Sequence, residues 1–151
     1  MPISNREIYN DSLALIGESL SSEYKEDYEE RAPYIIASVA SHNLMLDRRI
    51  RAAEALGEGN SFSPVYLSLD LNFPLCDRLA FPAALYVASL LVIDEDPDLS
   101  DTLYDKYCDA IASLETAYSG ERVILPSAGE NGAGSLGKAT CESITERYFH
   151  D

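Results

Sequence analysis

The sequence predicts an all-α protein, an antiparallel domain of about four helices with an extended loop and a glycine-rich C-terminal arm. Apolar residues recur three and four positions apart over long stretches, which is the spacing of one helix face. Capping residues or prolines precede these stretches, and glycines follow them. Strand-like alternation is limited to short segments. We therefore expect a helical domain over residues 1–120 and a flexible arm over 121–151.

The first helix is expected to begin at Ser4. Ser4 and Glu7 have the spacing of a capping box, in which each side chain bonds the backbone N–H of the other residue. Gly17 marks the expected end of this helix. The stretch 18–31 is polar and acidic, and we expect it to form a connection that runs into the next helix.

The second helix is expected between Pro33 and Gly57. Proline suits the first helical position and glycine suits the position just past the end. One apolar stripe runs along this helix, with Asn43 as its polar interruption. A buried asparagine can set the register or partner number of an oligomer. More often it bonds a neighbouring backbone group or a water molecule, and we favour this second role.

Residues 57–74 lack helix signals, and apolar and polar residues alternate there as they do in a strand. A single short strand has no partner in a compact helical domain. The segment is therefore either a packed extended loop or an element that pairs with another chain. The candidate contact residues in it are Val65, Tyr66, Leu67, Leu69 and Leu71.

Two further helices complete the expected domain. The third covers about residues 75–93 and is apolar on nearly all sides, so it should be the central helix. Pro82 either starts its regular part or bends it. The fourth begins at Asp96 and Pro97, a capping residue followed by a first-turn proline, and Gly120 ends it.

The composition excludes several classes of function. With 26 acidic and 11 basic residues, the formal net charge is −15, which argues against binding to a nucleic-acid backbone or an anionic membrane. Such a surface keeps a protein soluble, and it would also let DNA pass without sticking. The longest uncharged apolar run, residues 79–93, is shorter than the ~20 residues that cross a bilayer. Three widely spaced cysteines favour reduced thiols.

The arm contains a match to a nucleotide-binding pattern. Residues 132–138 read G-x-x-x-x-G-K, and the same glycines fit G-x-G-x-x-G. Only residues 139–151 follow, which are too few for the rest of a nucleotide-binding sheet. Ala139 also stands where a Ser or Thr hydroxyl should hold magnesium. We therefore expect no cofactor.

Four aspartates, Asp94, Asp96, Asp98 and Asp105, take positions one, three, five and twelve of a calcium-binding loop. Leu99 stands where that loop needs glycine, so we favour a capping role for these carboxylates at the start of the fourth helix. A calcium-responsive protein stays open as the alternative.

Catalytic constellations are scarce. His42 and His150 are the two histidines, and neither has the spacing of a zinc or di-iron site. No sequence spacing joins a histidine to a cysteine nucleophile. We expect no catalytic residue, no metal site and no enzymatic activity.

The order of elements carries a family resemblance. EIYNDSLALIGE is followed by a polar spacer, the long helix APYIIASVASHNLMLDRRI, a loop, FPLCDRLAFPAALYVASLLV, an acidic turn and LSDTLYDKYCDAIASLETAY. Over about residues 5–118 this order resembles bacteriophage head–tail connector proteins, also called adaptor or head-completion proteins. Many members carry a tryptophan near the end of the second helix, and this chain contains none.

The resemblance implies a structural protein of the virion at the head–tail interface, made in the cytoplasm of the bacterial host. It implies a ring homo-oligomer, expected to be a dodecamer, that binds the portal protein and the next tail component. DNA would pass through the ring without specific binding. We expect contacts with these partners at residues 65–71 and at Val123, Ile124 and Leu125. The alternative is a small acidic helical regulatory or calcium-responsive bacterial protein.

Overall fold

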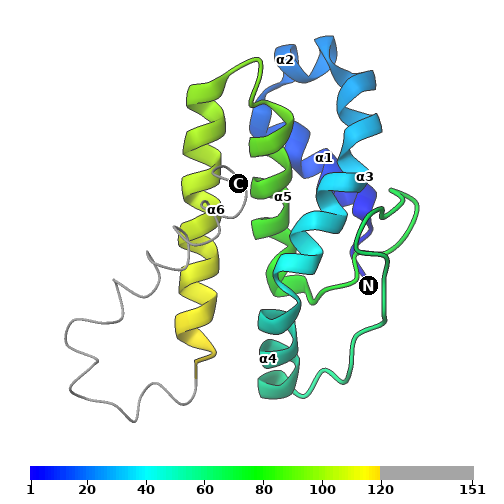
Figure 1. Cartoon of the computed structure of the whole chain (residues 1–151), viewed down its shortest axis with the longest axis vertical. Coiled ribbons are helices and arrows are strands. Elements are labelled where there is room, and N and C mark those ends of the chain that lie inside the picture. Colours follow the sequence, from blue (N-terminus) through cyan, green and yellow to red (C-terminus); the bar gives the residue numbers. More distant parts are fainter. Residues whose placement is uncertain (120–151) are drawn as a thin grey trace, which may run out of the picture.

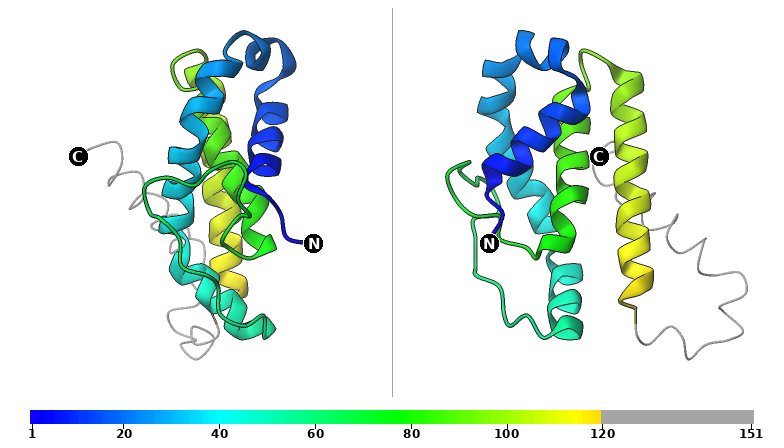
Figure 2. Two further views of the ribbon diagram at one scale, coloured as in Figure 1. Left: turned by 90° about the vertical axis from the view of Figure 1, so that its right-hand side faces the viewer. Right: turned by 180° about the vertical axis from the view of Figure 1, so that it is seen from behind.

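Helix α5 (Ala80–Leu91) lies at the centre of the structure, a computed structural model that describes residues 1–119. It packs against α6 (Pro97–Ala117) on one side and against α1 (Asn5–Ile16) and α3 (Lys25–His42) on the other (Figure 1). Seen from behind, α1 lies diagonally across α5 and α3 (Figure 2). The predicted all-α fold and the predicted central position of the most apolar helix are confirmed.

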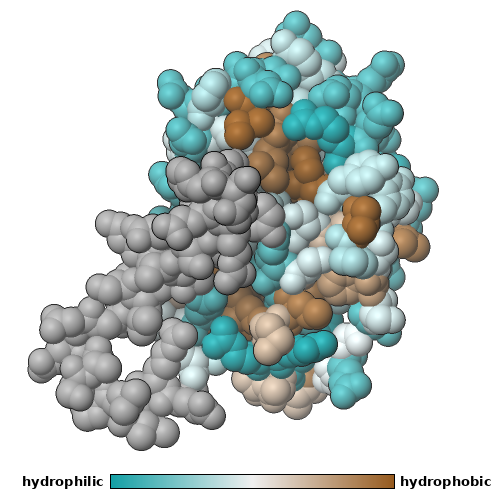
Figure 3. All heavy atoms as spheres, viewed as in Figure 1, coloured by the Kyte–Doolittle hydropathy of each residue, from teal (hydrophilic) through white to brown (hydrophobic). Residues whose placement is uncertain are grey.

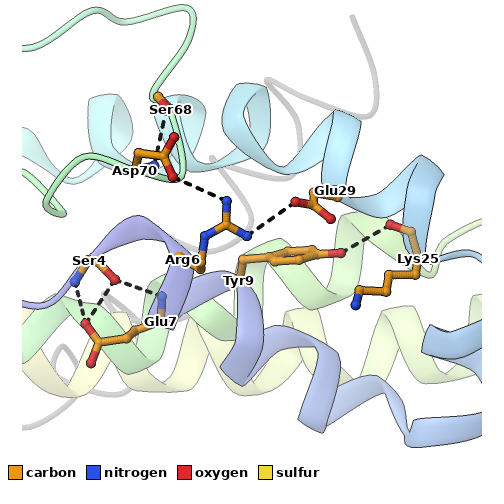
Figure 4. Close-up of polar contacts among 8 residues, drawn as sticks. All are labelled: Ser4, Arg6, Glu7, Tyr9, Lys25, Glu29, Ser68 and Asp70. Atoms are coloured by element: carbon orange, nitrogen blue, oxygen red, sulfur yellow. Dashed lines mark hydrogen bonds and ion pairs between the residues drawn. The ribbon is translucent and has the colours of Figure 1, made fainter.

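The start of α1 is fixed by a local hydrogen-bond exchange. The Glu7 backbone N–H donates to Ser4 Oγ at 3.1 Å, and the Ser4 N–H donates to Glu7 Oε2 at 2.7 Å (Figure 4). The predicted capping box is therefore confirmed. The Ser4 N–H, and then the Ser4 hydroxyl at 3.0 Å, donate to the Glu7 carboxylate and lower its pKa, because they favour the ionised form.

The polar stretch after α1 is helical, so its prediction as a connection was wrong. Helix α2 (Glu18–Glu23) follows Gly17, whose φ of 108° separates it from α1, and α3 already begins at Lys25. Tyr28 in this stretch and Ala32 just after it are buried in the core. Burial of these apolar side chains stabilises the start of α3. The many acidic residues around them made this stretch look like a solvent-exposed connection.

Pro33 accordingly lies inside α3 rather than at its first turn. A proline there removes one helical hydrogen bond. Its ring is buried, and its carbonyl accepts a hydrogen bond from the Leu67 N–H at 3.1 Å, which attaches the extended segment to α3.

The expected long second helix is broken in two at Asn43. Helix α3 ends at His42, and α4 covers Leu44–Glu54. The buried Asn43 Nδ2 donates to Val39 O and to Tyr107 Oη, each at 2.9 Å. Side-chain bonds to a nearby carbonyl compete with a regular helix. The favoured role for Asn43, a bond to a neighbouring backbone group, is confirmed.

Tyrosine rings fill the interface around this break. Tyr86 contacts Tyr107 edge to face at 5.0 Å between ring centroids, and Tyr104 lies 5.8 Å from Tyr107. The His42 ring packs against Tyr86 at 6.2 Å. Burial raises the pKa of both Tyr86 and Tyr107, since an apolar site disfavours the phenolate.

The 3₁₀ turn η1 (Asp77–Leu79) leads into α5, which begins at Ala80 rather than at the expected residue 75. Pro82 lies in the first turn of α5, so it starts the helix and does not bend it. At α6 the Leu99 N–H donates to Asp96 Oδ1 at 3.1 Å, which confirms the predicted cap. Within residues 1–119, none of the helices is long and apolar enough to cross a bilayer.

A buried carboxylate holds α4 to the turn that precedes η1. Asp47, which is 2% exposed, accepts hydrogen bonds from Arg51 Nε at 2.9 Å and from the Cys76 N–H at 2.7 Å. Arg51 Nη2 also donates to Pro74 O at 3.3 Å. Removal of one partner from a buried pair leaves the other charge unpaired, and this is costly.

We therefore expect Asp47→Ala to lower the free energy of unfolding by about 3 kcal/mol, because Arg51 and the Cys76 N–H both lose their acceptor. Urea unfolding followed by circular dichroism measures it. The control is Asp109→Ala on the exposed face of α6, with an expected change within about 0.5 kcal/mol. Equal effects of the two variants would contradict the anchoring role of Asp47.

Alkaline pH should destabilise the protein through its buried tyrosines. Burial raises the pKa of Tyr9 from 10.0 to about 12, so the folded protein keeps this proton after the unfolded chain has lost it. The contribution is complete below pH 10 and is lost as the pH rises from 10 through about 12. The free energy of unfolding, measured across that window, should fall less steeply in Tyr9→Phe. Identical slopes would contradict this assignment.

Candidate functional site

Residues 55–76 form an extended segment without regular structure between α4 and η1. It leaves α4, runs beside the N-terminus and returns to the start of α5 (Figure 1). Its backbone pairs with the chain's own N-terminal residues. The Asn5 N–H donates to Leu71 O at 2.9 Å, and the Phe73 N–H donates to Ile3 O at 2.8 Å. Of the two expected alternatives, the packed extended loop is the one observed.

Side chains add to this attachment. Asn5 is fully buried, and its Nδ2 donates to Ser68 O at 2.9 Å. Arg6 lies between two carboxylates, with Nη1 3.3 Å from Glu29 and Nη2 3.4 Å from Asp70 (Figure 4). Both ion pairs are exposed, so each is worth at most about 1 kcal/mol. The buried amide and the two ion pairs therefore attach the segment to α1 and α3 at separate points.

The candidate contact residues divide into core and surface. Leu67 and Leu69 are only 4% and 6% exposed and belong to the hydrophobic core. Val65, Tyr66 and Leu71 are 66%, 46% and 54% exposed. The chain turns at residues 68–71, where the Leu71 N–H bonds Ser68 O, and simple alternation ends there. Val123, Ile124 and Leu125 lie outside the described residues, as do His150 and the glycine-rich match at 132–138.

Two of the three exposed residues, Tyr66 and Leu71, line a groove of about 1320 Å³, whereas Val65 lies outside it. Leu114 from α6 also lines this groove. Charged side chains of both signs also line it: Arg51, Glu54, Glu58, Asp77 and Arg78. The remaining large apolar lining residues are Ile3, Leu56, Phe62, Leu67, Phe73 and Leu75. We call this surface the apolar groove.

One wall of the apolar groove is fixed by Glu54, the last residue of α4. Its Oε2 accepts a hydrogen bond from Tyr118 Oη at 2.6 Å and lies 3.1 Å from Arg78 Nε. The Tyr118 hydrogen bond, and then Arg78, lower the pKa of the Glu54 carboxyl. The carboxylate therefore joins α4, η1 and the end of α6.

A second hollow of about 950 Å³ lies across the same loop. It shares Arg51, Phe62 and Pro74 with the apolar groove and adds Leu44 and Arg48. The loop at residues 57–62 therefore separates two concave surfaces, and its polar and glycine residues are largely exposed.

Two further exposed apolar side chains lie in the apolar groove or contact a residue that lines it. Tyr34 on α3 is 55% exposed and meets Tyr66 edge to face at 5.1 Å. Leu56 is 50% exposed in the apolar groove. Figure 3 shows separate hydrophobic patches set among hydrophilic residues on one face of the molecule. The position of Tyr34 off the apolar stripe of its helix was the signal that could have identified it.

In residues 1–119 no group of three His, Cys, Asp or Glu side chains could hold a metal ion. Asp98 and Asp105 lie within α6, so the acidic stretch does not form a calcium-binding loop. Burial raises the pKa of the Cys76 thiol to about 11, which keeps it protonated and unreactive.

Comparisons of the chain with protein-family models, with curated proteins and with solved structures found no match.

Truncation of the two leucines on either side of Asp70 should affect the free energy of unfolding very differently. Leu69→Ala should lower the free energy of unfolding by about 2–5 kcal/mol, because it opens a cavity in the core. Leu71→Ala removes an exposed side chain, so the expected change is within about 0.5 kcal/mol. Thermal or urea unfolding of the pair measures both. A large decrease in the free energy of unfolding of Leu71→Ala would show that this residue belongs to the core and not to the contact surface.

Proposed function

We propose that this chain is a head–tail connector protein of a phage or prophage, whose copies form a ring below the portal. The observation that carries the proposal is the apolar groove, bordered by the exposed Leu56, Tyr66 and Leu71. Exposed apolar side chains beside a concave surface are typical of protein–protein contacts. The family resemblance specifies which kind of assembly these contacts build.

The size of the groove favours a peptide segment over a small ligand. Pockets for small molecules measure roughly 300–1,000 Å³ and present a few converging polar groups. The apolar groove measures about 1320 Å³, and its charged residues Arg51, Glu54 and Arg78 already bond within the chain. An elongated apolar partner therefore suits it better than a polar metabolite.

Contacts through side chains fit the extended segment better than added β-pairing. The N–H groups of Leu67, Leu71 and Phe73 donate to carbonyls of the same chain, and that of Tyr66 donates to Ser63 Oγ. A partner strand would have to displace these bonds. The partner-contact residues that we propose here are therefore Val65, Tyr66 and Leu71, which act through their side chains.

The net charge of −15 suits a ring around DNA. Exposed carboxylates repel the phosphate backbone, so packaged DNA would slide through such a ring without binding it. The portal protein and the next tail component are the proposed protein partners, and the virion is the proposed location.

The ring can be tested with the purified full-length chain. Native mass spectrometry should detect a closed homo-oligomer, and Tyr66→Asp with Leu71→Asp should abolish it, because two charges would be buried at the subunit contact. Circular dichroism should stay unchanged, since both residues are exposed. Phe81→Asp, which is 59% exposed but outside the groove, is the matched control and should still assemble.

A chain that stays monomeric at every concentration, and does not bind the portal encoded beside it, would contradict the proposal. Calcium calorimetry separates it from the calcium-responsive alternative. The connector should give no heat of binding, whereas a saturable heat would favour the alternative.

A further inference from the structure

The described chain ends at one rim of the apolar groove. Leu114, near the end of α6, lines the groove. One turn later, Tyr118 Oη donates to Glu54 Oε2 at 2.6 Å, and Glu54 lines the groove as well. The residues after Tyr118 therefore begin beside this surface.

The next apolar residues are close enough to enter it. Val123 is the fifth residue after Tyr118, and five residues reach at most about 17 Å. Val123, Ile124 and Leu125 are three large aliphatic residues in succession, with Pro126 after them. Three adjacent aliphatic side chains match a groove whose walls include Leu56, Tyr66 and Leu71, because all of these groups gain by leaving water.

We propose that residues 123–125 pack into the apolar groove of the same chain. A short tether makes the local concentration of an attached segment roughly millimolar, which favours it over the same segment of a separate copy. The groove of a free subunit is then occupied by its own chain.

Occupation of the groove by residues 123–125 of the same chain, which we call self-occupancy, adds a control step to assembly. This consequence rests on the proposed function, since it takes the groove as the contact surface of the ring. Residues 123–125 must leave the groove before another protein can enter it. A chain that ends at Ser119 should therefore form oligomers at lower protein concentration than the full chain.

A single fluorescent reporter tests the packing itself. The chain contains no tryptophan, so Ile124→Trp introduces the sole indole. In the monomeric full-length protein, its emission should be blue-shifted and protected from iodide. Leu71→Asp or Leu56→Asp in the same background should shift the emission to that of a water-exposed indole. Phe81→Asp, outside the groove, should leave it unchanged.

Three outcomes would overturn the proposal. The first is an indole emission typical of water exposure when the groove is unchanged, and the second is an emission that neither groove variant shifts. The third is a protection of the indole from iodide that disappears when the protein is diluted. The last would assign the groove to a segment of another copy. Because the readout is made on the monomer, it is independent of the ring. If the Ile124→Trp chain forms rings although its indole is exposed to water, the proposed connector function is retained. The packing of residues 123–125 into the groove of the same chain is then excluded.

Discussion

The buried carboxylate of Asp47 is the interaction on which the apolar groove depends. It accepts hydrogen bonds from Arg51 and from the backbone of Cys76, so it fixes the return of the extended segment against α4. Arg51 extends the same network to the carbonyl of Pro74. Without this anchor, the end of the segment near Cys76 would lose its buried polar attachment to α4, whereas the backbone bonds of Leu67, Leu71 and Phe73 would still hold the rest of the segment.

The molecule therefore combines two kinds of packing. The helices around α5 are held by apolar burial. In α4 and the extended segment, core residues such as Ile50 and Leu69 are joined by polar anchors at the buried Asn43 and Asp47 and at the partly exposed Glu54. Hydrogen-bonded polar groups fix geometry without covering all nearby apolar surface. This explains how Tyr66 and Leu71 stay exposed beside a well-defined wall, in an arrangement suited to a partner segment.

Local signals in the sequence predicted local structure well. The Ser4–Glu7 box and the Asp96 cap each need only residues within one turn, and both are present. The break at Asn43 involves Tyr107, which is 64 positions away, so spacing along the chain could not reveal it. The same limit applies to the extended segment. Alternation suggested one face for Leu69 and Leu71, but the turn between them, and the bonds to the N-terminus, bury one and expose the other.

If the apolar groove is the contact surface between chains of a ring, an electron cryomicroscopy map of the assembled full-length protein should show it. We expect a closed ring of identical subunits in which Tyr66 and Leu71 are buried beneath a chain segment at each subunit contact. An assembly in which the groove faces open solvent, or whose contacts lie on other surfaces of the helices, would contradict it.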